Sequence, residues 1–281
     1  MIKIIADTTC GIPYPALINA GIEVLPQIIT FENESYRDDT EIDTASFLLK
    51  LRASTTLPKT AAPPHALYDP IYRKILDDGD SALVITPSAE VSGTYRSAIT
   101  AAQEFNTDRI KIIDTRTIAG GLGSIVLQAK KWADTGMPMD ELVHNIETMM
   151  SKEHVYFMVP TLEYLHKGGR IGGAAKLVGD LLKIVPILSI QNGKVEPYEK
   201  VRTNKQAYRR IVDLIVNQCK KNPTPYITIS HCDNQAGAEI LKQKIVAALR
   251  IQDLPVFVIP PAIVVHVGPE ALSVSFFADK K

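Results

Sequence analysis

A polar stretch between two apolar segments, SAEVSGTY at residues 88–95, is the part of the chain best suited to hold an anion. It follows the apolar run Ala82–Thr86 and precedes a helical pattern, so the predicted order is strand, loop, helix. Free backbone N–H groups and the helix dipole favour negative charge at such a junction. Ser92 and Thr94 add hydroxyl groups on either side of Gly93. With one glycine and no lysine, the loop suits a small, singly charged anion such as a carboxylate.

Two other interpretations of this loop were weighed. A nucleotide phosphate is a poor fit, because the chain lacks GxxxxGK[ST] and no GxGxxG follows a predicted strand. Gly120–Gly123 is glycine-rich but opens a helical pattern without a following lysine, which indicates mainly a packing role. Alternatively, Ser92 or Thr94 merely caps the helix, and spacing alone favours that structural role.

Further hydroxyl groups are expected at the same edge of the sheet. Loops that follow parallel strands line one crevice, and ligands bind there. The segments Asp7–Thr9 and Asp114–Thr117 each follow an apolar run, and Thr60 lies in the proline-rich segment Leu57–Pro64, which we expect to be a loop. The sequence therefore predicts a polar site assembled from several loops.

Two basic residues stand out in the second half. His266 follows the apolar run Ala262–Val265, which we predict to be a strand, and it could be a structural donor or a ligand contact. The segment LEYLHKGGRIGG, residues 162–173, surrounds Arg170 with four glycines. These glycines predict a break in the helical pattern, with a helix end at Gly168 or the next residue. Alternatively, Arg170 meets an anion or an acidic partner.

Composition excludes several classes of protein. The 281 residues carry 31 basic and 31 acidic side chains, which gives no support to nucleic-acid binding. Three scattered cysteines and six histidines form no metal-ligand pattern, so we expect no metal. The apolar run at the start is too short for a signal peptide, and Leu254–Val267 is too short to span a bilayer. We therefore expect a cytoplasmic protein.

The order of predicted elements indicates an α/β protein with two domains. Strand and helix patterns alternate over residues 1–151, which predicts a parallel sheet. Residues 152–281 mix hairpins with helices, which predicts a largely antiparallel sheet. The strongest hairpin signal is Asn192-Gly193 between two strand runs. A second hairpin is expected around Asn33, and Asp43 is a plausible helix N-cap.

Seven segments in order resemble motifs of the DegV family, and together they cover nearly the whole chain. The match at the predicted anion loop is EVSGTYRSA, residues 90–98. The others are ADTTCGIP (6–13), KTAAPP (59–64), IIDTRTIAGGLG (112–123), LEYLHKGGRI (162–171), KIVPILSIQNGKVEPYEKVRTNKQA (183–207) and VVHVGPEALSV (264–274). The chain departs from the family pattern at Ala61-Ala62, which replaces a polar pair, at Pro64 and at Gly11.

This resemblance implies a function in bacterial lipid metabolism. Similar proteins bind a long-chain fatty acid and present its carboxylate to a separate ATP-dependent kinase, whose acyl-phosphate product serves phospholipid synthesis. By resemblance, Thr60, Ser92 and His266 would hold the carboxylate, with Gly93 and Thr94 supporting them. Such a protein is a binding subunit rather than an enzyme, needs no cofactor, and would make at most transient membrane contact.

The same resemblance places Arg170 and Arg202 near the mouth of the site, where they would help the kinase or the transferring phosphoryl group. For the apolar lining, the candidates are Ile28, Ile118, Leu122 and Ile263. The preferred acyl chain, the oligomeric state and the particular kinase partner do not follow from the sequence.

Parts of the sequence also fit other functions, though less well. A hydrolase or acyltransferase would use Ser92 as nucleophile and His266 as base, but GxSxG is absent and no carboxylate is evident to orient the histidine. Cys10 is a weaker candidate nucleophile. A sugar or dihydroxyacetone-type phosphotransfer domain resembles the first half in architecture only, and architecture carries little weight for function.

Overall fold

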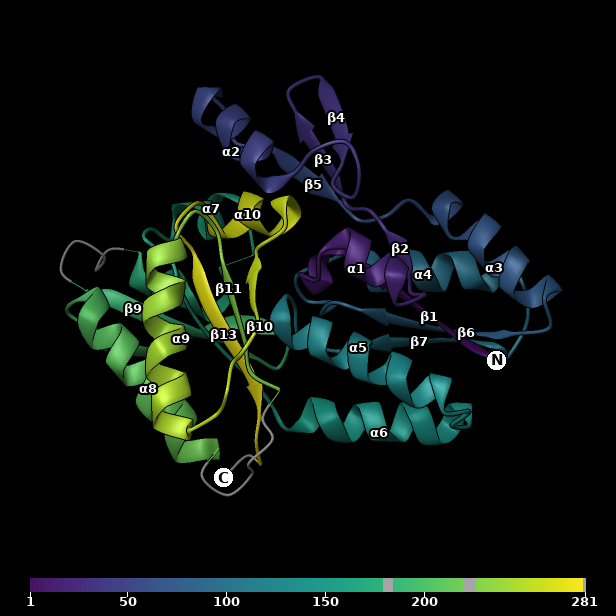
Figure 1. Ribbon diagram of the computed structural model, residues 1–281. Coiled ribbons are helices and arrows are strands. Elements are labelled where there is room, and N and C mark those ends of the chain that lie inside the picture. The colour runs from purple at the N-terminus through teal and green to yellow at the C-terminus, as the bar shows by residue number, and fades with distance from the viewer. Residues whose placement is uncertain (179–183, 220–225, 280–281) are drawn as a thin grey trace.

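The computed structural model describes residues 1–178, 184–219 and 226–279, and Figure 1 shows three sheets. In the first, the strand order is β2-β1-β6-β7 and all pairs are parallel, as predicted. The strands are β1 (Ile2–Asp7), β2 (Glu23–Leu25), β6 (Ser81–Thr86) and β7 (Ile110–Asp114). The helices around them are η1 (Thr8–Cys10), α1 (Tyr14–Asn19), η2 (His65–Leu67), α3 (Asp69–Asp77), α4 (Thr94–Gln103), α5 (Gly120–Asp134) and α6 (Met139–Ser151).

Both faces of this parallel sheet are covered. Alternate strand residues such as Ile4 and Leu83 pack with α5 and α6, whereas Ile5 and Val84 pack with α3 and α4. The central strand β6 is buried on both faces, and its run Ala82–Ile85 is continuously apolar rather than alternating. This arrangement brings the loops after β1, β6 and β7 to one edge, facing the second half of the chain (Figure 1).

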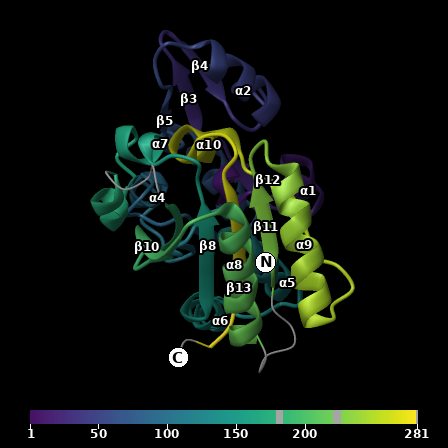
Figure 2. The same ribbon diagram turned by 90° about the vertical axis from the view of Figure 1, so that its left-hand side faces the viewer.

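The second large sheet has the order β10-β9-β8-β13-β11-β12, and within the described residues all its pairs except β11–β12 are antiparallel. Helices α8 and α9 cover one face (Figure 2). The strands are β8 (Glu153–Met158), β9 (Val185–Gln191), β10 (Lys194–Val201), β11 (Thr228–His231), β12 (Val256–Val258) and β13 (Leu272–Phe277). The helices of this half are α7 (Glu163–Lys167), η3 (Gly172–Leu177), α8 (Asn204–Cys219), α9 (Gln235–Leu249) and α10 (Pro261–Val267).

A small antiparallel sheet, β4-β3-β5, projects above the two large ones together with α2 (Figure 1). The predicted hairpin around Asn33 is confirmed, and Asp43 caps α2 by accepting the Ser46 N–H at 2.7 Å. Apolar side chains of this unit share a core with the second half of the chain, so a division into domains 1–151 and 152–281 stays a prediction. The elements are β3 (Ile28–Phe31), β4 (Glu34–Arg37), α2 (Thr44–Ala53) and β5 (Lys59–Ala61).

Two local predictions were wrong. The run that includes Ile263–Val265 is not a strand but the helix α10, because a short apolar run has no periodicity to separate the two and Pro261 suits a first helical turn. Residues Lys59–Ala61, expected in a loop, pair with β3 as the strand β5.

The predicted helical pattern over 161–183 breaks after α7 with Gly168 as its C-cap, and its end at 179–183 lies outside the described residues. Lys220, at the predicted end of α8, also lies outside them.

Candidate functional site

An apolar cavity lies where the loops of the parallel sheet meet the second sheet, on the face opposite to α8 and α9. Val155 and Phe157 of β8 face it, whereas the alternate residues Tyr156 and Met158 pack against α8 and α9. Unfilled space between the lining side chains measures about 940 Å³, open solvent at the mouth included. Other lining residues are Ala62, Val91, Ile118, Ala119, Leu165, Ile190, Val195, Ile259, Ala262, Ile263, Val267, Ala271 and Leu272.

The polar residues of the lining are few: Thr9, Gln27, Thr60, Ser92, Arg170, His266 and Ser273. All three predicted carboxylate ligands are among them, so the structure brings Thr60, Ser92 and His266 to one cavity. Of the predicted apolar lining, Ile118 and Ile263 face the cavity. Leu122 instead packs in the core between the parallel sheet and α5, and Ile28 does not line the cavity.

The polar lining residues form two hydrogen-bonded groups, which we call the arms of the polar end. Thr60 and His266 form the first arm. Thr60 Oγ1 lies 2.8 Å from His266 Nε2, which joins β5 to α10 across 206 residues of sequence. Burial, with a smaller effect from the Arg170 charge, lowers the pKa of His266 to about 4. The imidazole is therefore neutral near pH 7.

The tautomer of His266 follows from its second nitrogen. Nδ1 is buried, and among the described residues it has no hydrogen-bond partner. A buried N–H without a partner is more costly than a bare lone pair, so the proton belongs on Nε2 and is donated to Thr60. The Thr60 hydroxyl proton then remains for a ligand oxygen in the cavity. Gly168 permits this packing, because a Cβ there would lie 2.4 Å from Nδ1.

Ser92 and Thr94 form the other arm. Ser92 Oγ lies 2.9 Å from Thr94 Oγ1 and accepts the Thr94 N–H at 3.2 Å. The N-cap position of α4 is occupied by Gly93 and not by Ser92 or Thr94, although the Ser92 hydroxyl satisfies the N–H of the first helical residue. Thr94 Oγ1 also contacts Asp7 Oδ2 at 2.8 Å and Gln27 Nε2 at 2.9 Å.

Asp7 and Gln27 were not predicted as site residues. Asp7 is 1% exposed, and burial raises its pKa despite hydrogen bonds from Thr9, Thr94 and Gln27. The sequence places Asp7 before two hydroxyl residues, a signal that could have found it. Nothing in the sequence around Gln27 marks it, because its partners are 20 and 67 residues away.

The two predicted arginines lie in different settings. Arg170 lines the cavity and donates to the carbonyl oxygens of Gly168 at 2.7 Å and Val91 at 3.2 Å. Burial lowers its pKa, although an arginine stays charged at neutral pH. Arg202 is exposed after β10 and does not line the cavity. Across the described residues no cluster of His, Cys, Asp or Glu could hold a metal ion.

The geometry does not favour serine nucleophilic catalysis. A serine nucleophile needs a hydrogen bond to its base, and a third group must orient that base. Here the Ser92 hydroxyl contacts Thr94, and the His266 ring contacts Thr60. Burial raises the pKa of the Cys10 thiol to about 12, so this cysteine is not an activated nucleophile.

Fold and site together define an α/β protein with an apolar cavity whose lining includes a few hydroxyl groups. A model of the DegV family matches residues 1–279, and the chain belongs to that family. A DegV domain-containing protein of Streptomyces coelicolor is 32% identical, with 97% of each chain covered.

Two solved structures of the same family are close in fold. A DegV family protein from Thermus thermophilus, described as fatty-acid binding, has a TM-score of 0.93 and 28% identity, with 99% of each chain covered. DegV from Bacillus subtilis, described as a fatty acid binding protein, has a TM-score of 0.89 and 27% identity over 99% of each chain. Among the described residues, no helix has the length and apolar character that crossing a membrane requires.

Proposed function

We propose that this protein binds a long-chain fatty acid, with the acyl chain in the apolar cavity and the carboxylate between Thr60, Ser92 and His266. The observation that carries the proposal is the composition of the lining: it is mostly apolar, with a few hydroxyl groups and the neutral imidazole of His266 in contact with Thr60. The descriptions of the Thermus and Bacillus relatives support the same ligand class.

The two parts of the cavity would have different tasks. Each buried CH₂ group contributes about 0.8 kcal/mol, so a long acyl chain supplies most of the affinity. One hydrogen bond to a charged group contributes about 1.5–3 kcal/mol, enough to fix which end of the ligand lies at the hydroxyl groups. The carboxylate would thereby stay near the mouth.

We further propose that the bound carboxylate is presented to a separate ATP-dependent kinase subunit in the cytoplasm. The protein itself would do no chemistry, and the acyl-phosphate would serve phospholipid synthesis. Arg170 would stabilise charge beside the carboxylate, since it already lines the cavity. Arg202, which is exposed, would contact the kinase or the transferring phosphoryl group.

Native mass spectrometry of the purified chain tests the ligand class. The expected spectrum contains a fatty acid at one per chain, which dissociates under collision. Replacement of Ala262 by Trp in the cavity wall should remove that mass. A serine enzyme would instead hydrolyse activated esters in a way that Ser92→Ala abolishes. A lipid-free spectrum together with no binding of added fatty acid would refute the carrier function.

A further inference from the structure

The arm that contains Ser92 continues into the protein as a chain of hydrogen bonds that ends on a carboxylate. Asp7 Oδ1 accepts the Thr9 N–H at 3.0 Å and the Thr9 hydroxyl. Asp7 Oδ2 lies 2.6 Å from Gln27 Nε2 and 2.8 Å from Thr94 Oγ1. Thr94 Oγ1 in turn lies 2.9 Å from Ser92 Oγ, which lines the cavity. The direction of each bond in this chain depends on where its protons are.

With Asp7 ionised, the hydrogen bonds that link Asp7, Thr94 and Ser92 can have only one donor-to-acceptor direction. Asp7 Oδ2 can only accept, so Thr94 donates its single hydroxyl proton there. Thr94 Oγ1 then accepts from Gln27 and from the Ser92 hydroxyl. The Ser92 hydroxyl therefore donates its hydrogen bond to Thr94, and only a lone pair of Ser92 Oγ faces the cavity. A carboxylate oxygen at that position would bring its lone pair against that of Ser92 Oγ, with no proton between the two oxygens.

One added proton reverses the chain without breaking a hydrogen bond. With a proton on Oδ2, Asp7 donates to Thr94, and Thr94 donates to Ser92. Ser92 then donates its own proton to the ligand, and it still accepts the Thr94 N–H. Each hydroxyl group keeps its own proton and only rotates, so the sum is one proton taken from solution by Asp7 for one carboxylate bound.

We propose that Asp7 takes up one proton when a carboxylate anion binds, and that Thr94 transmits the reversal to Ser92. Asp7 and Thr94 are thus positioning residues, since they set the direction of a hydroxyl group that touches the ligand. The proposal rests on the proposed function, because it needs an anionic head group at Ser92.

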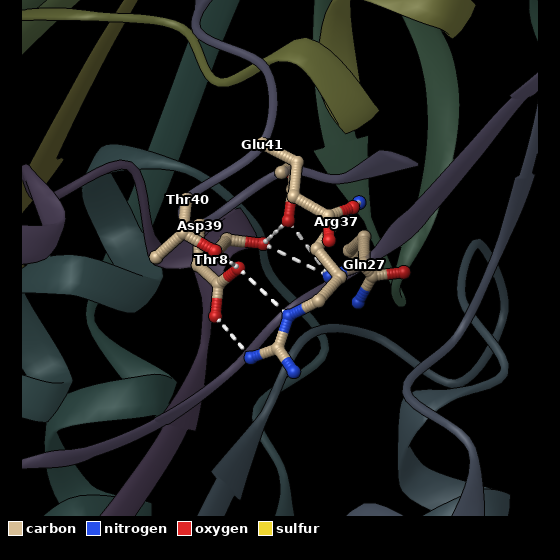
Figure 3. A network of polar contacts seen from close by, with 7 residues as sticks. Thr8, Gln27, Arg37, Asp39, Thr40 and Glu41 are labelled. Atoms are coloured by element: carbon tan, nitrogen blue, oxygen red, sulfur yellow. Dashed lines mark hydrogen bonds and ion pairs between the residues drawn. The ribbon is translucent and has the colours of Figure 1, made fainter. Parts of the chain in front are cut away.

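The groups that set the pKa of Asp7 are hydrogen-bond donors and burial, and none of them is a cation. The titratable groups that act on it are the carboxyl of Asp38, the thiol of Cys10 and the hydroxyl of Tyr68. Asp38 belongs to the neighbouring loop, and its Oδ2 is buried with no partner among the described residues. Arg37, the cation beside that loop, pairs with Asp39 (Figure 3). A second negative charge, that of the ligand, would therefore further favour a neutral Asp7.

Isothermal titration calorimetry counts the proton directly. Oleate is titrated into the delipidated full chain at about pH 8 in buffers with different ionisation enthalpies, and the slope of apparent enthalpy gives the uptake. We expect net proton uptake on oleate binding to the unmodified chain, and a dissociation constant that rises with pH over the range in which Asp7 is ionised in the free protein and protonated in the complex. In Asp7→Asn, which cannot take up a proton, the uptake should vanish and the pH profile should become flat.

Two further variants guard against trivial explanations. Thr94→Val removes the link and should also abolish uptake, even if Asp7→Asn folds poorly. Asp38→Asn removes the other buried carboxyl group, and the uptake of a proton should persist in this variant. Uptake that survives in Asp7→Asn and Thr94→Val would put the proton on the ligand or Asp38 and overturn the inference. Stoichiometric oleate binding without proton uptake in the unmodified chain would overturn the coupling alone. Absence of any binding would overturn the proposed function with it.

Discussion

The two arms at the polar end of the cavity are built differently. The Thr60–His266 arm joins the small sheet to α10 and contains no ionised group, because burial keeps the imidazole neutral. The Ser92–Thr94 arm belongs to the loops of the parallel sheet and ends on the buried carboxyl of Asp7. Both offer a hydroxyl group to the same cavity.

This difference indicates that one hydroxyl group is fixed as a donor and the other can change direction. The tautomer of His266 leaves the proton of Thr60 for the ligand. The proton of Ser92 depends on the charge of Asp7, two hydrogen bonds away. Four predictions test this contrast, from the largest expected effect to the smallest.

The first prediction concerns the cost of burying carboxyl groups behind the second arm. Burial raises the pKa of Asp38 to about 7, whereas the unfolded chain titrates near its ordinary value. The contribution of Asp38 to stability is therefore greatest below about pH 4 and is lost as the pH rises through about 7. Asp38→Asn should remove this loss and stabilise the protein at pH 8 by up to about 4 kcal/mol, measured by urea unfolding across the pH range.

The adjacent residue provides a control of opposite sign. Burial opposes ionisation of Asp39, but hydrogen bonds from Arg37 and Thr40 together hold its pKa below the ordinary value (Figure 3). Its stabilising effect is present above that ordinary value and is lost as the pH falls, so Asp39→Asn should destabilise the protein at pH 8. Equal pH profiles for the two variants would contradict the assignment.

The second prediction removes both donors. Thr60→Val combined with Ser92→Ala deletes two hydrogen bonds to a charged group, so the affinity for oleate should fall by more than about a hundredfold. The affinity for the methyl ester of oleic acid, which has the same chain and no charge, should hardly change. A comparable loss for both ligands would mean that the hydroxyl groups shape the cavity and do not bind the carboxylate.

The third prediction separates the arms. Thr60→Val and Ser92→Ala should each weaken oleate binding about tenfold. Only Ser92→Ala should also abolish the uptake of a proton, because only Ser92 is connected to Asp7. Titration calorimetry in two buffers measures both quantities. If Thr60→Val abolished the uptake as well, the two arms would not be independent.

The fourth prediction concerns residues outside the arms. Arg202→Ala should leave oleate binding unchanged, since this side chain is exposed and does not line the cavity. Transfer of phosphate from ATP by a fatty acid kinase should become slower. Arg209→Ala, another exposed arginine on the following helix, serves as the matched control. Loss of the ligand from Arg202→Ala would be inconsistent with a role in phosphoryl transfer alone.

Much of the fold could be predicted because its signals are local. Alternating strand and helix patterns indicated the parallel sheet, and Asn192-Gly193 marked the β9–β10 hairpin. The strand β5 and the helix α10 were missed, because pairing with β3 decides the first and burial on every side conceals the periodicity of the second.

The sequence by itself determined the fold class, the family and the residue types of the polar end, including Thr60, Ser92 and His266. These follow from motifs and from short-range patterns. Only the tertiary structure decided which side chains touch: His266 with Thr60, and Ser92 through Thr94 with Asp7. The reason is physical, since hydrogen-bond direction and pKa depend on burial and on partners that are 87 or 206 residues apart.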